Sequence, residues 1–259
     1  MQPSKLKRKL IAKEATVGSW LSLGNRSVCE MMATLGGFDW LVVDMEHTAT
    51  DFQAMTDLIQ ITDLCGLEPL VRVGTNDPLL IKRALDAGAH GIIVPQVNTP
   101  EDARKAVASA YYPPRGNRGA GLFRAQGYSD DFDSYHRWAE TEITVIAQIE
   151  HHEGVTNLEE IMATDGIDGF LIGPYDLSAS LGHPGDFSHA DVEAQLDRLA
   201  DYARQGDKPA GIHVVSPDAA HLRRRLEEGF IFIAYGTDML FLSERLTHEK
   251  ASVRAVNGE

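Results

Sequence analysis

Two carboxylates stand where two apolar runs of strand length end. Glu150 closes the run TVIAQIE, and Asp176 directly follows the run GFLIGPY. If these runs form neighbouring parallel strands of a barrel, their carboxyl ends meet at one rim. Two carboxylates there could bind a divalent cation such as Mg²⁺, which prefers oxygen ligands and leaves other positions to water and substrate. Either carboxylate alone could equally cap a helix or pair with an arginine, so the metal prediction depends on the pair.

Two further side chains could act on a substrate at the same rim. Arg72, near the end of the run EPLVRVG, stays charged and offers a rigid fork of donors. Aimed at a ketone oxygen, it would stabilise an enolate. His47 follows the run DWLVVDM and titrates in the range useful for proton transfer. The alternatives are an arginine paired with a barrel carboxylate and a structural histidine.

Residues beside the two carboxylates could hold the rest of a substrate. Side chains two positions apart share a face of a strand, so Gln148 and Glu150 point the same way. In the stretch GPYDLSASLG, Gly173 and Pro174 turn the chain out of a strand. The backbone N–H groups that follow, around Tyr175, could receive a substrate carboxylate.

The strand-length runs contain no lysine. Lys82 and Lys105 fall in helix-like segments, and Lys208 comes just before the seventh run. A Schiff-base mechanism needs an amine inside the site. The sequence therefore favours metal-dependent over lysine-dependent carbon–carbon cleavage.

The elements that must position these residues alternate between strand length and helix length, which is typical of βα units. Because 259 residues suit one (β/α)8 barrel, we predict the α/β class and a single TIM-barrel domain over residues 1–259. The predicted strands cover residues 17–23, 39–45, 68–74, 90–97, 144–150, 169–175, 209–215 and 230–236. One irregular stretch, residues 111–137, is predicted to be a binding loop or a subunit contact, with a plain exposed loop as the alternative.

Composition excludes several classes of function. The formal charge of −14 argues against nucleic acid as a partner, because such binding needs basic residues. Cys29 and Cys65 are too few for a disulfide framework or a zinc finger and fit a reduced cytoplasm. We find no secretory signal and no apolar run long enough to cross a membrane.

Seven stretches, taken in their order and spacing, carry a family resemblance over essentially the whole chain. They are GSWLSL, GFDWLVVDMEH, LVRV, IKRALDAGAHGIIVPQV, YPPRGNRG, QIE followed by GV, and GPYDLSASLG. The chain resembles the HpcH/HpaI family of class II pyruvate aldolases. The resemblance implies a (β/α)8 barrel and retro-aldol cleavage of 4-hydroxy-2-oxo acids to pyruvate and an aldehyde. It also implies Mg²⁺, Mn²⁺ or Co²⁺ as cofactor and a homo-hexamer built as a trimer of dimers.

The resemblance also implies roles for single residues. The metal ligands of the family correspond to Glu150 and Asp176, its enolate-stabilising arginine to Arg72 and its base to His47. Gln148 and Asp44 correspond to substrate-binding positions, and Asp86 corresponds to the partner of the base. Asp86, the implied partner of His47, comes near the end of a helix-like run and thus at the opposite rim. We therefore expect it to reach His47 from a neighbouring subunit.

Three positions depart from the family pattern. His151 and His152 follow Glu150, and we expect them to be exposed polar residues that open a helix. Tyr235, near the end of the eighth run, is expected to narrow the pocket. None replaces a ligand or Arg72, so these changes bear on the aldehyde acceptor rather than on the reaction.

Enolate chemistry leaves other outcomes open. An acyl-CoA lyase or an oxaloacetate decarboxylase would form the same enolate, and a metabolite-binding barrel without catalysis is a further alternative. A CoA lyase needs a basic surface for nucleotide phosphates, and no compact Lys and Arg cluster stands near the strand ends. We expect an aldolase that acts on small 2-oxo acids and aldehydes through a metal-bound enolate.

Overall fold

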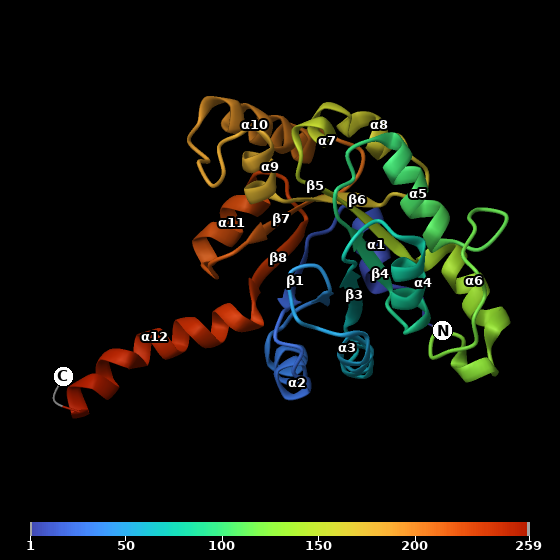
Figure 1. Cartoon of the computed structure of the whole chain (residues 1–259), viewed down its shortest axis with the longest axis horizontal. Coiled ribbons are helices and arrows are strands. Elements are labelled where there is room, and N and C mark those ends of the chain that lie inside the picture. The colour runs from blue at the N-terminus through green and yellow to red at the C-terminus, as the bar shows by residue number, and fades with distance from the viewer. Residues whose placement is uncertain (1, 258–259) are drawn as a thin grey trace.

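Eight parallel strands close into one barrel (Figure 1). The structure, a computed structural model, describes residues 2–257. Each strand pairs with the next along the chain, and the last pairs with the first. The predicted (β/α)8 fold is therefore confirmed. The strands are β1 (Thr16–Leu21), β2 (Trp40–Asp44), β3 (Glu68–Arg72), β4 (Gly91–Val94), β5 (Thr144–Ile149), β6 (Gly169–Ile172), β7 (Ala210–Val214) and β8 (Phe232–Thr237).

Helices surround the barrel, and most begin just beyond the carboxyl end of a strand. Several start at a side-chain cap: Asp77 accepts hydrogen bonds from the backbone at the start of α4, and Thr99 and Asp102 form a capping box on α5. The helices are α1 (Lys5–Ile11), α2 (Arg26–Leu35), α3 (Phe52–Leu64), α4 (Pro78–Asp86), α5 (Pro100–Ala110), α6 (Phe132–Glu142), α7 (His152–Thr156), α8 (Leu158–Ala163), α9 (Pro174–Ser180), α10 (Ala190–Gln205), α11 (Ala219–Glu227) and α12 (Asp238–Asn257).

Strand side chains alternate between the inside of the barrel and the layer beneath the helices. The interior is filled by large apolar groups, among which Trp40 and Phe232 stack with ring centroids 4.4 Å apart. Helix α1 closes the amino-terminal end, where Leu6 and Leu10 join this interior cluster. Burial at that end leaves the carboxyl end of the barrel as the open one.

Glu68 of β3 fastens α1 to the barrel. Its carboxylate accepts hydrogen bonds from the hydroxyl of Ser4 at 3.1 Å, the backbone N–H of Lys5 at 2.7 Å and Nδ1 of His90 at 2.7 Å. Burial alone would raise the pKa of Glu68, but the hydrogen bond and charge of His90 and the two α1 contacts outweigh it and lower the pKa.

The irregular stretch is shorter than predicted, because α6 begins at Phe132 and takes in its last six residues. The remaining part folds back on its own barrel through Arg118, which is buried. The guanidinium of Arg118 donates to Asp86 at 2.6 Å and to the hydroxyl of Tyr135 at 2.9 Å. This segment is thus anchored near the end of α4 rather than loosely exposed.

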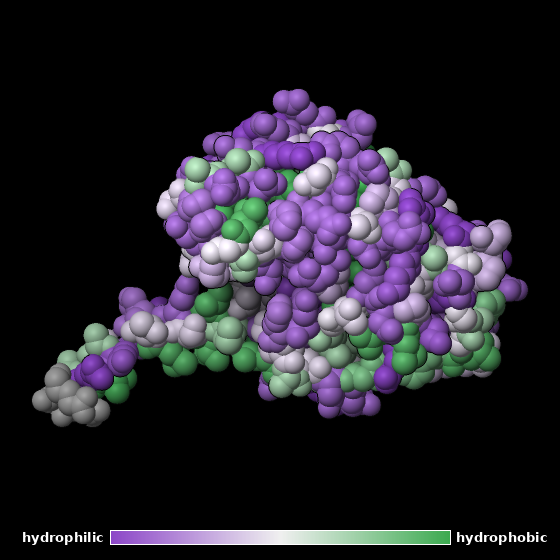
Figure 2. All heavy atoms as spheres, turned by 45° about the horizontal axis from the view of Figure 1, so that its top comes forward, coloured by the Kyte–Doolittle hydropathy of each residue, from purple (hydrophilic) through white to green (hydrophobic). Residues whose placement is uncertain are grey.

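Helix α12 runs away from the barrel after its first turn (Figure 1). It carries the exposed apolar residues Met239, Leu242 and Leu246. Figure 2 shows hydrophobic residues both along this helix and on the adjoining edge of the body. Within residues 2–257, no helix combines the length and the apolar character needed to cross a membrane.

Candidate active site

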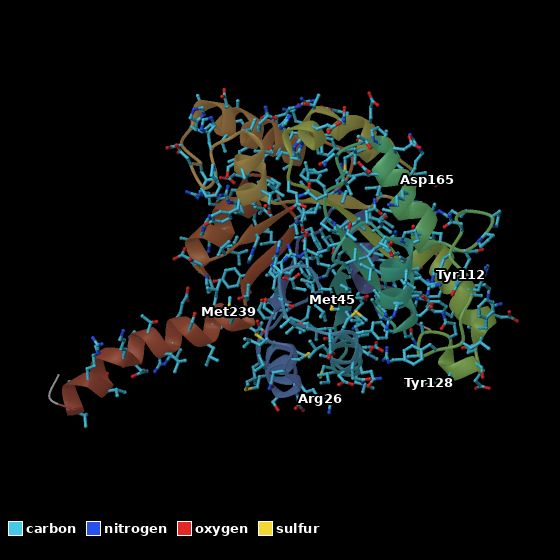
Figure 3. All side chains as sticks on the ribbon, viewed as in Figure 1. Arg26, Met45, Tyr112, Tyr128, Asp165 and Met239 are labelled. Carbon is cyan, nitrogen blue, oxygen red and sulfur yellow. The ribbon has the colours of Figure 1, made fainter. Side chains whose placement is uncertain are left out.

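Strand alternation places one layer of mostly polar side chains above the apolar interior. Val42, Leu70 and Ile146 belong to the interior cluster. Two positions later on the same strands stand Asp44, Arg72 and Gln148, which therefore point into the barrel mouth. Figure 3 shows Met45, directly after β2, between β1 and β3, as the strand order requires.

A cavity of 240 Å³ opens at this rim. It gathers most of the predicted site residues: His47, Arg72, Gln148, Gly173, Pro174, Tyr175 and Asp176. The structure thus brings together, at the carboxyl end of the barrel, side chains as far apart in the sequence as His47 and Asp176.

Arg72 is held in one orientation from several sides. Its Nε donates to Oδ1 of Asp44 at 2.9 Å and its Nη2 to Oδ2 at 2.7 Å. Its Cζ lies 4.4 Å from the ring centroid of Trp20, a cation–π contact. A carboxylate oxygen of Glu46 lies 3.3 Å from Nε. Asp44 therefore positions the guanidinium, and both of its oxygens are engaged within the protein.

Glu150 is buried at the end of β5, with 1% of its surface exposed. Its Oε1 accepts a hydrogen bond from the backbone N–H of Gln96 at 2.8 Å, and Gln148 Nε2 donates to Oε2. Burial is the main cause that raises the pKa of Glu150; the two hydrogen bonds oppose it, and the negative charge of Asp176 adds to it. Asp176 stands in the first turn of α9, directly after β6, the strand that pairs with β5.

These residues fit a divalent cation. A Cβ atom on Gly173 would overlap the Glu150 side chain, so glycine is required beside the carboxylate. Glu150 and Asp176 are oxygen donors whose mutual repulsion a cation would relieve. Two protein ligands also leave coordination positions for water and substrate, and Mg²⁺ in proteins usually keeps such positions.

A second potential ligand cluster lies elsewhere. His183, His189 and Asp191, between α9 and the first turn of α10, have ligand atoms within 4.8 Å of one another. The rings of the two histidines stack, and His189 caps α10. This cluster is separate from the rim carboxylates, and its contacts are those of a helix start.

His47 and Glu46 stand side by side at the mouth. The His47 side chain is 63% exposed, and its Nε2 lies 3.7 Å from Oε2 of Glu46. That oxygen is buried and has no hydrogen-bond partner among the described residues. Burial, together with the charges of Glu150 and Asp44, raises the pKa of Glu46 to about 7 although Arg72 opposes the shift. The sequence analysis did not single out Glu46, because its burial is a property of the folded rim.

Asp86 is engaged within its own chain. It lies at the end of α4 and accepts hydrogen bonds from Arg118 at 2.6 Å and Gln126 at 3.1 Å. Within the described residues it makes no contact with His47. A pairing of the two between subunits remains a prediction.

The three unusual positions have distinct places. His151 Nδ1 accepts from the backbone N–H of Glu153, and His152 begins α7, so these histidines open a helix as predicted. The expectation that Tyr235 narrows the pocket is wrong. Ala234 belongs to the barrel interior, so its neighbour Tyr235 points outward and packs near Phe241.

Two aromatic residues of the cavity were missed by the sequence analysis. Trp20 of β1 and His213 of β7 line it from the two strands that flank β8. The signal was available: each stands within a strand-length run at the parity of an inward-facing residue. Neither residue type on its own indicates chemistry at such a position.

The chain is similar to proteins of one family over most of its length. The sequence model of the HpcH/HpaI aldolase/citrate lyase family matches residues 16–244. A 5-keto-4-deoxy-D-glucarate aldolase from Escherichia coli O139:H28 is 40% identical over 237 residues, which cover 92% of this chain and 91% of that protein. The crystal structure of an HpcH/HpaI aldolase/citrate lyase family protein from Burkholderia cenocepacia J2315 is 37% identical, with a TM-score of 0.89 over 97% of this chain and 99% of that one. An HpcH/HpaI aldolase from Desulfitobacterium hafniense DCB-2 is 30% identical, with a TM-score of 0.86 over 96% of each chain.

Proposed function

We propose that this chain, which belongs to the HpcH/HpaI aldolase/citrate lyase family, reversibly cleaves a 4-hydroxy-2-oxo acid to pyruvate, or a related 2-oxo acid, and an aldehyde. The family and its relatives make it an aldolase, a carbon–carbon lyase, and confirm the resemblance that the motifs indicated. The E. coli relative is named for 5-keto-4-deoxy-D-glucarate, so this acid is the first candidate substrate.

The observation that carries the proposal is the fixed guanidinium of Arg72 at the cavity. Asp44 and Trp20 hold it in place, so it loses little freedom when it binds a substrate oxygen. It would donate to the oxo oxygen at C2 and stabilise the enolate that forms when the C3–C4 bond breaks. Asp44 acts through Arg72 in this proposal, in place of the direct substrate contact inferred from sequence.

Glu150 and Asp176 would hold Mg²⁺, Mn²⁺ or Co²⁺, which when bound would polarise the oxo group as a Lewis acid. Gln148 supports this pair, because its amide donates to Glu150. The backbone after Gly173, with Pro174 and Tyr175 at the cavity wall, would receive the carboxylate of the substrate.

His47 is placed to move the proton that cleavage releases. It lines the cavity yet remains largely exposed, so it can exchange protons with solvent. We assign it as the base that takes the proton from the C4 hydroxyl, directly or through water.

The assembly that we propose is a homo-oligomer, a trimer of dimers by family resemblance. Helix α12 supports it, since this helix leaves its own barrel and exposes apolar side chains. At its root lies an apolar cavity of 690 Å³ lined in part by Met31, Leu35 and Phe38. In such an assembly Asp86 of one subunit would orient His47 of another.

The decisive experiment measures pyruvate release from a panel of 4-hydroxy-2-oxo acids, including 5-keto-4-deoxy-D-glucarate, with and without chelator. We expect release that chelation abolishes and Mg²⁺, Mn²⁺ or Co²⁺ restores. Release that survives complete metal removal would refute the metal site. Oxaloacetate is assayed beside the panel, and pyruvate release from it alone would instead identify a decarboxylase.

A further inference from the structure

Two polar groups on one side of the active cavity lack partners in the described protein. That side is formed by Trp20 and His213, whose ring centroids lie 5.8 Å apart, and we call it the Trp20–His213 wall. Nε1 of Trp20 is buried and makes no hydrogen bond to any residue of the described chain. An indole N–H can only donate, so the wall has a hydrogen-bond donor whose acceptor must be a ligand or water.

The hydrogen bond of His213 decides which of its ring nitrogens is free. Nε2 lies 3.2 Å from the carbonyl oxygen of Gly236. A carbonyl only accepts, so Nε2 carries the proton and Nδ1 presents a lone pair. Burial, aided by the positive charge of Arg72, lowers the pKa of His213 to about 4 against the effect of the Gly236 bond, so the ring is neutral at pH 7. Nδ1 makes no hydrogen bond to a described residue.

Strand alternation directs the His213 ring into the mouth of the barrel. Its neighbours Ile212 and Val214 belong to the core beneath the helices, so His213 faces the opposite way. There it joins Trp20, Arg72 and Gln148 around the cavity. The adjoining lining residues Leu171, Ile172 and Val215 are apolar, so the wall is a local polar feature.

We propose that the Trp20–His213 wall binds a hydroxyl group on C3 of the 2-oxo acid donor. A hydroxyl both accepts and donates, which matches a donor on Trp20 and an acceptor on His213. The inference rests on the proposed function, because it takes the oxo oxygen at Arg72 as the reference point. It makes a hydroxypyruvate-like acid a better donor than pyruvate, the donor half of 5-keto-4-deoxy-D-glucarate, with the Trp20–His213 wall as the specificity determinant.

The Trp20–His213 wall lies deep in the cavity, so it faces the 2-oxo acid half of the substrate rather than the aldehyde half. Trp20 is almost wholly buried and lies against the guanidinium that binds the oxo oxygen. C3 is the only substituent of the oxo carbon besides the carboxylate, which the residues after Gly173 receive on another side of the cavity. The aldehyde half lies beyond C3, toward the exposed His47.

The first test uses the unaltered protein loaded with Mn²⁺ and compares three small acids by calorimetric titration. Hydroxypyruvate should bind about fivefold tighter than pyruvate, the worth of a typical net hydrogen bond. 3-Fluoropyruvate has a C3 substituent of similar size that cannot donate a hydrogen bond, so it should bind like pyruvate. Equal binding of hydroxypyruvate and 3-fluoropyruvate would overturn the proposal without any variant.

The second test measures aldol addition of each donor to glycolaldehyde. The variant His213→Leu should lower the ratio of kcat/KM for hydroxypyruvate over pyruvate about fivefold, the worth of one net hydrogen bond. Trp20→Phe should lower the same ratio, and His221→Leu, a matched change on α11, should leave it unaltered. An equal loss for both donors would assign His213 a structural part and refute the subsite. If no 4-hydroxy-2-oxo acid is cleaved but the binding preference is present, the proposed function fails and the subsite stands.

Discussion

A Cβ atom built on Gly173 would lie 2.6 Å from both the Cβ and Oε2 of Glu150. Real Cβ atoms do not come so close to another atom, and Glu150 is buried in a closely packed part of the protein. The glycine at the end of β6 therefore makes room for the carboxylate at the end of β5. This relationship ties the turn before α9 to the proposed metal ligand across two neighbouring strands.

Gly173→Ala should displace the Glu150 carboxylate and weaken Mn²⁺ binding by about tenfold or more, equivalent to about 1.4 kcal/mol. Calorimetric titration of metal-free protein with Mn²⁺ measures the change. Gly119→Ala is the control, because its Cβ would meet nothing nearer than Lys82 Cδ at 4.0 Å. If Gly173→Ala kept the parent affinity for Mn²⁺, Glu150 would not be a ligand of the metal.

Arg72→Ala should slow both aldol cleavage and exchange of the C3 protons of pyruvate by about 10²–10³-fold, the usual effect of losing one preorganised donor. Asp44→Asn should act in the same direction but less, because Arg72 keeps its charge and loses only its bidentate support. Both variants should bind Mn²⁺ with the affinity of the parent protein. Arg26→Ala, which breaks an exposed ion pair with Asp57, is the control. Proton exchange that persists at the normal rate in Arg72→Ala would remove this arginine from the mechanism.

Glu68 should make stability fall in acid. Its pKa is lower in the folded protein than in the unfolded chain, so the charged carboxylate stabilises the fold above the unfolded pKa. That contribution is lost as the pH falls through the lowered pKa. Glu68→Gln should lower the free energy of unfolding by about 1–3 kcal/mol at pH 7, since buried partners lose a charged acceptor. In acid, the free energies of unfolding of the variant and the parent protein should become equal. Urea unfolding at a series of pH values measures both, and a gap that is constant with pH would contradict the assignment.

The exposed apolar face of α12 should hold subunits together. Leu246 is 62% exposed on the projecting helix, and Leu246→Glu should shift the protein toward smaller assemblies in light scattering. Leu64→Glu, on α3 and 83% exposed, places the same charge on an apolar site of the barrel body and should leave the assembly intact. Identical masses for the two variants would show that α12 does not mediate assembly.

Local pattern was enough to predict the barrel and most of the rim. The strand runs carry apolar residues on both faces, as buried parallel strands do, and polar groups such as Arg72 and Gln148 stand where those runs end. The start of α6 was missed although Tyr135, Trp138 and Ala139 repeat with helical spacing, because Asp and Ser dominate the residues before them. Tyr235 was misplaced because only its distance from the strand end was considered. Its place in the alternation of inward and outward side chains, one position after the inward-facing Ala234, was not. The roles of Glu46 and His213 depend on burial and on Arg72, which only the folded rim brings to them.

Glu46 should shape how activity depends on pH. Its pKa is raised to about 7 by burial, so it is charged above neutrality and protonated below. Glutamine resembles the protonated form, so Glu46→Gln should match the parent protein near pH 6. Above pH 7 its kcat should fall several-fold short, because His47 loses the negative charge 3.7 Å from Nε2. A pH profile of pyruvate release for both proteins measures the difference, with Glu30→Gln on the exposed face of α2 as the control. A loss of kcat confined to high pH requires a carboxylate that titrates between pH 6 and pH 8. An equal loss of kcat at both pH values would show that Glu46 acts through packing and not through its charge.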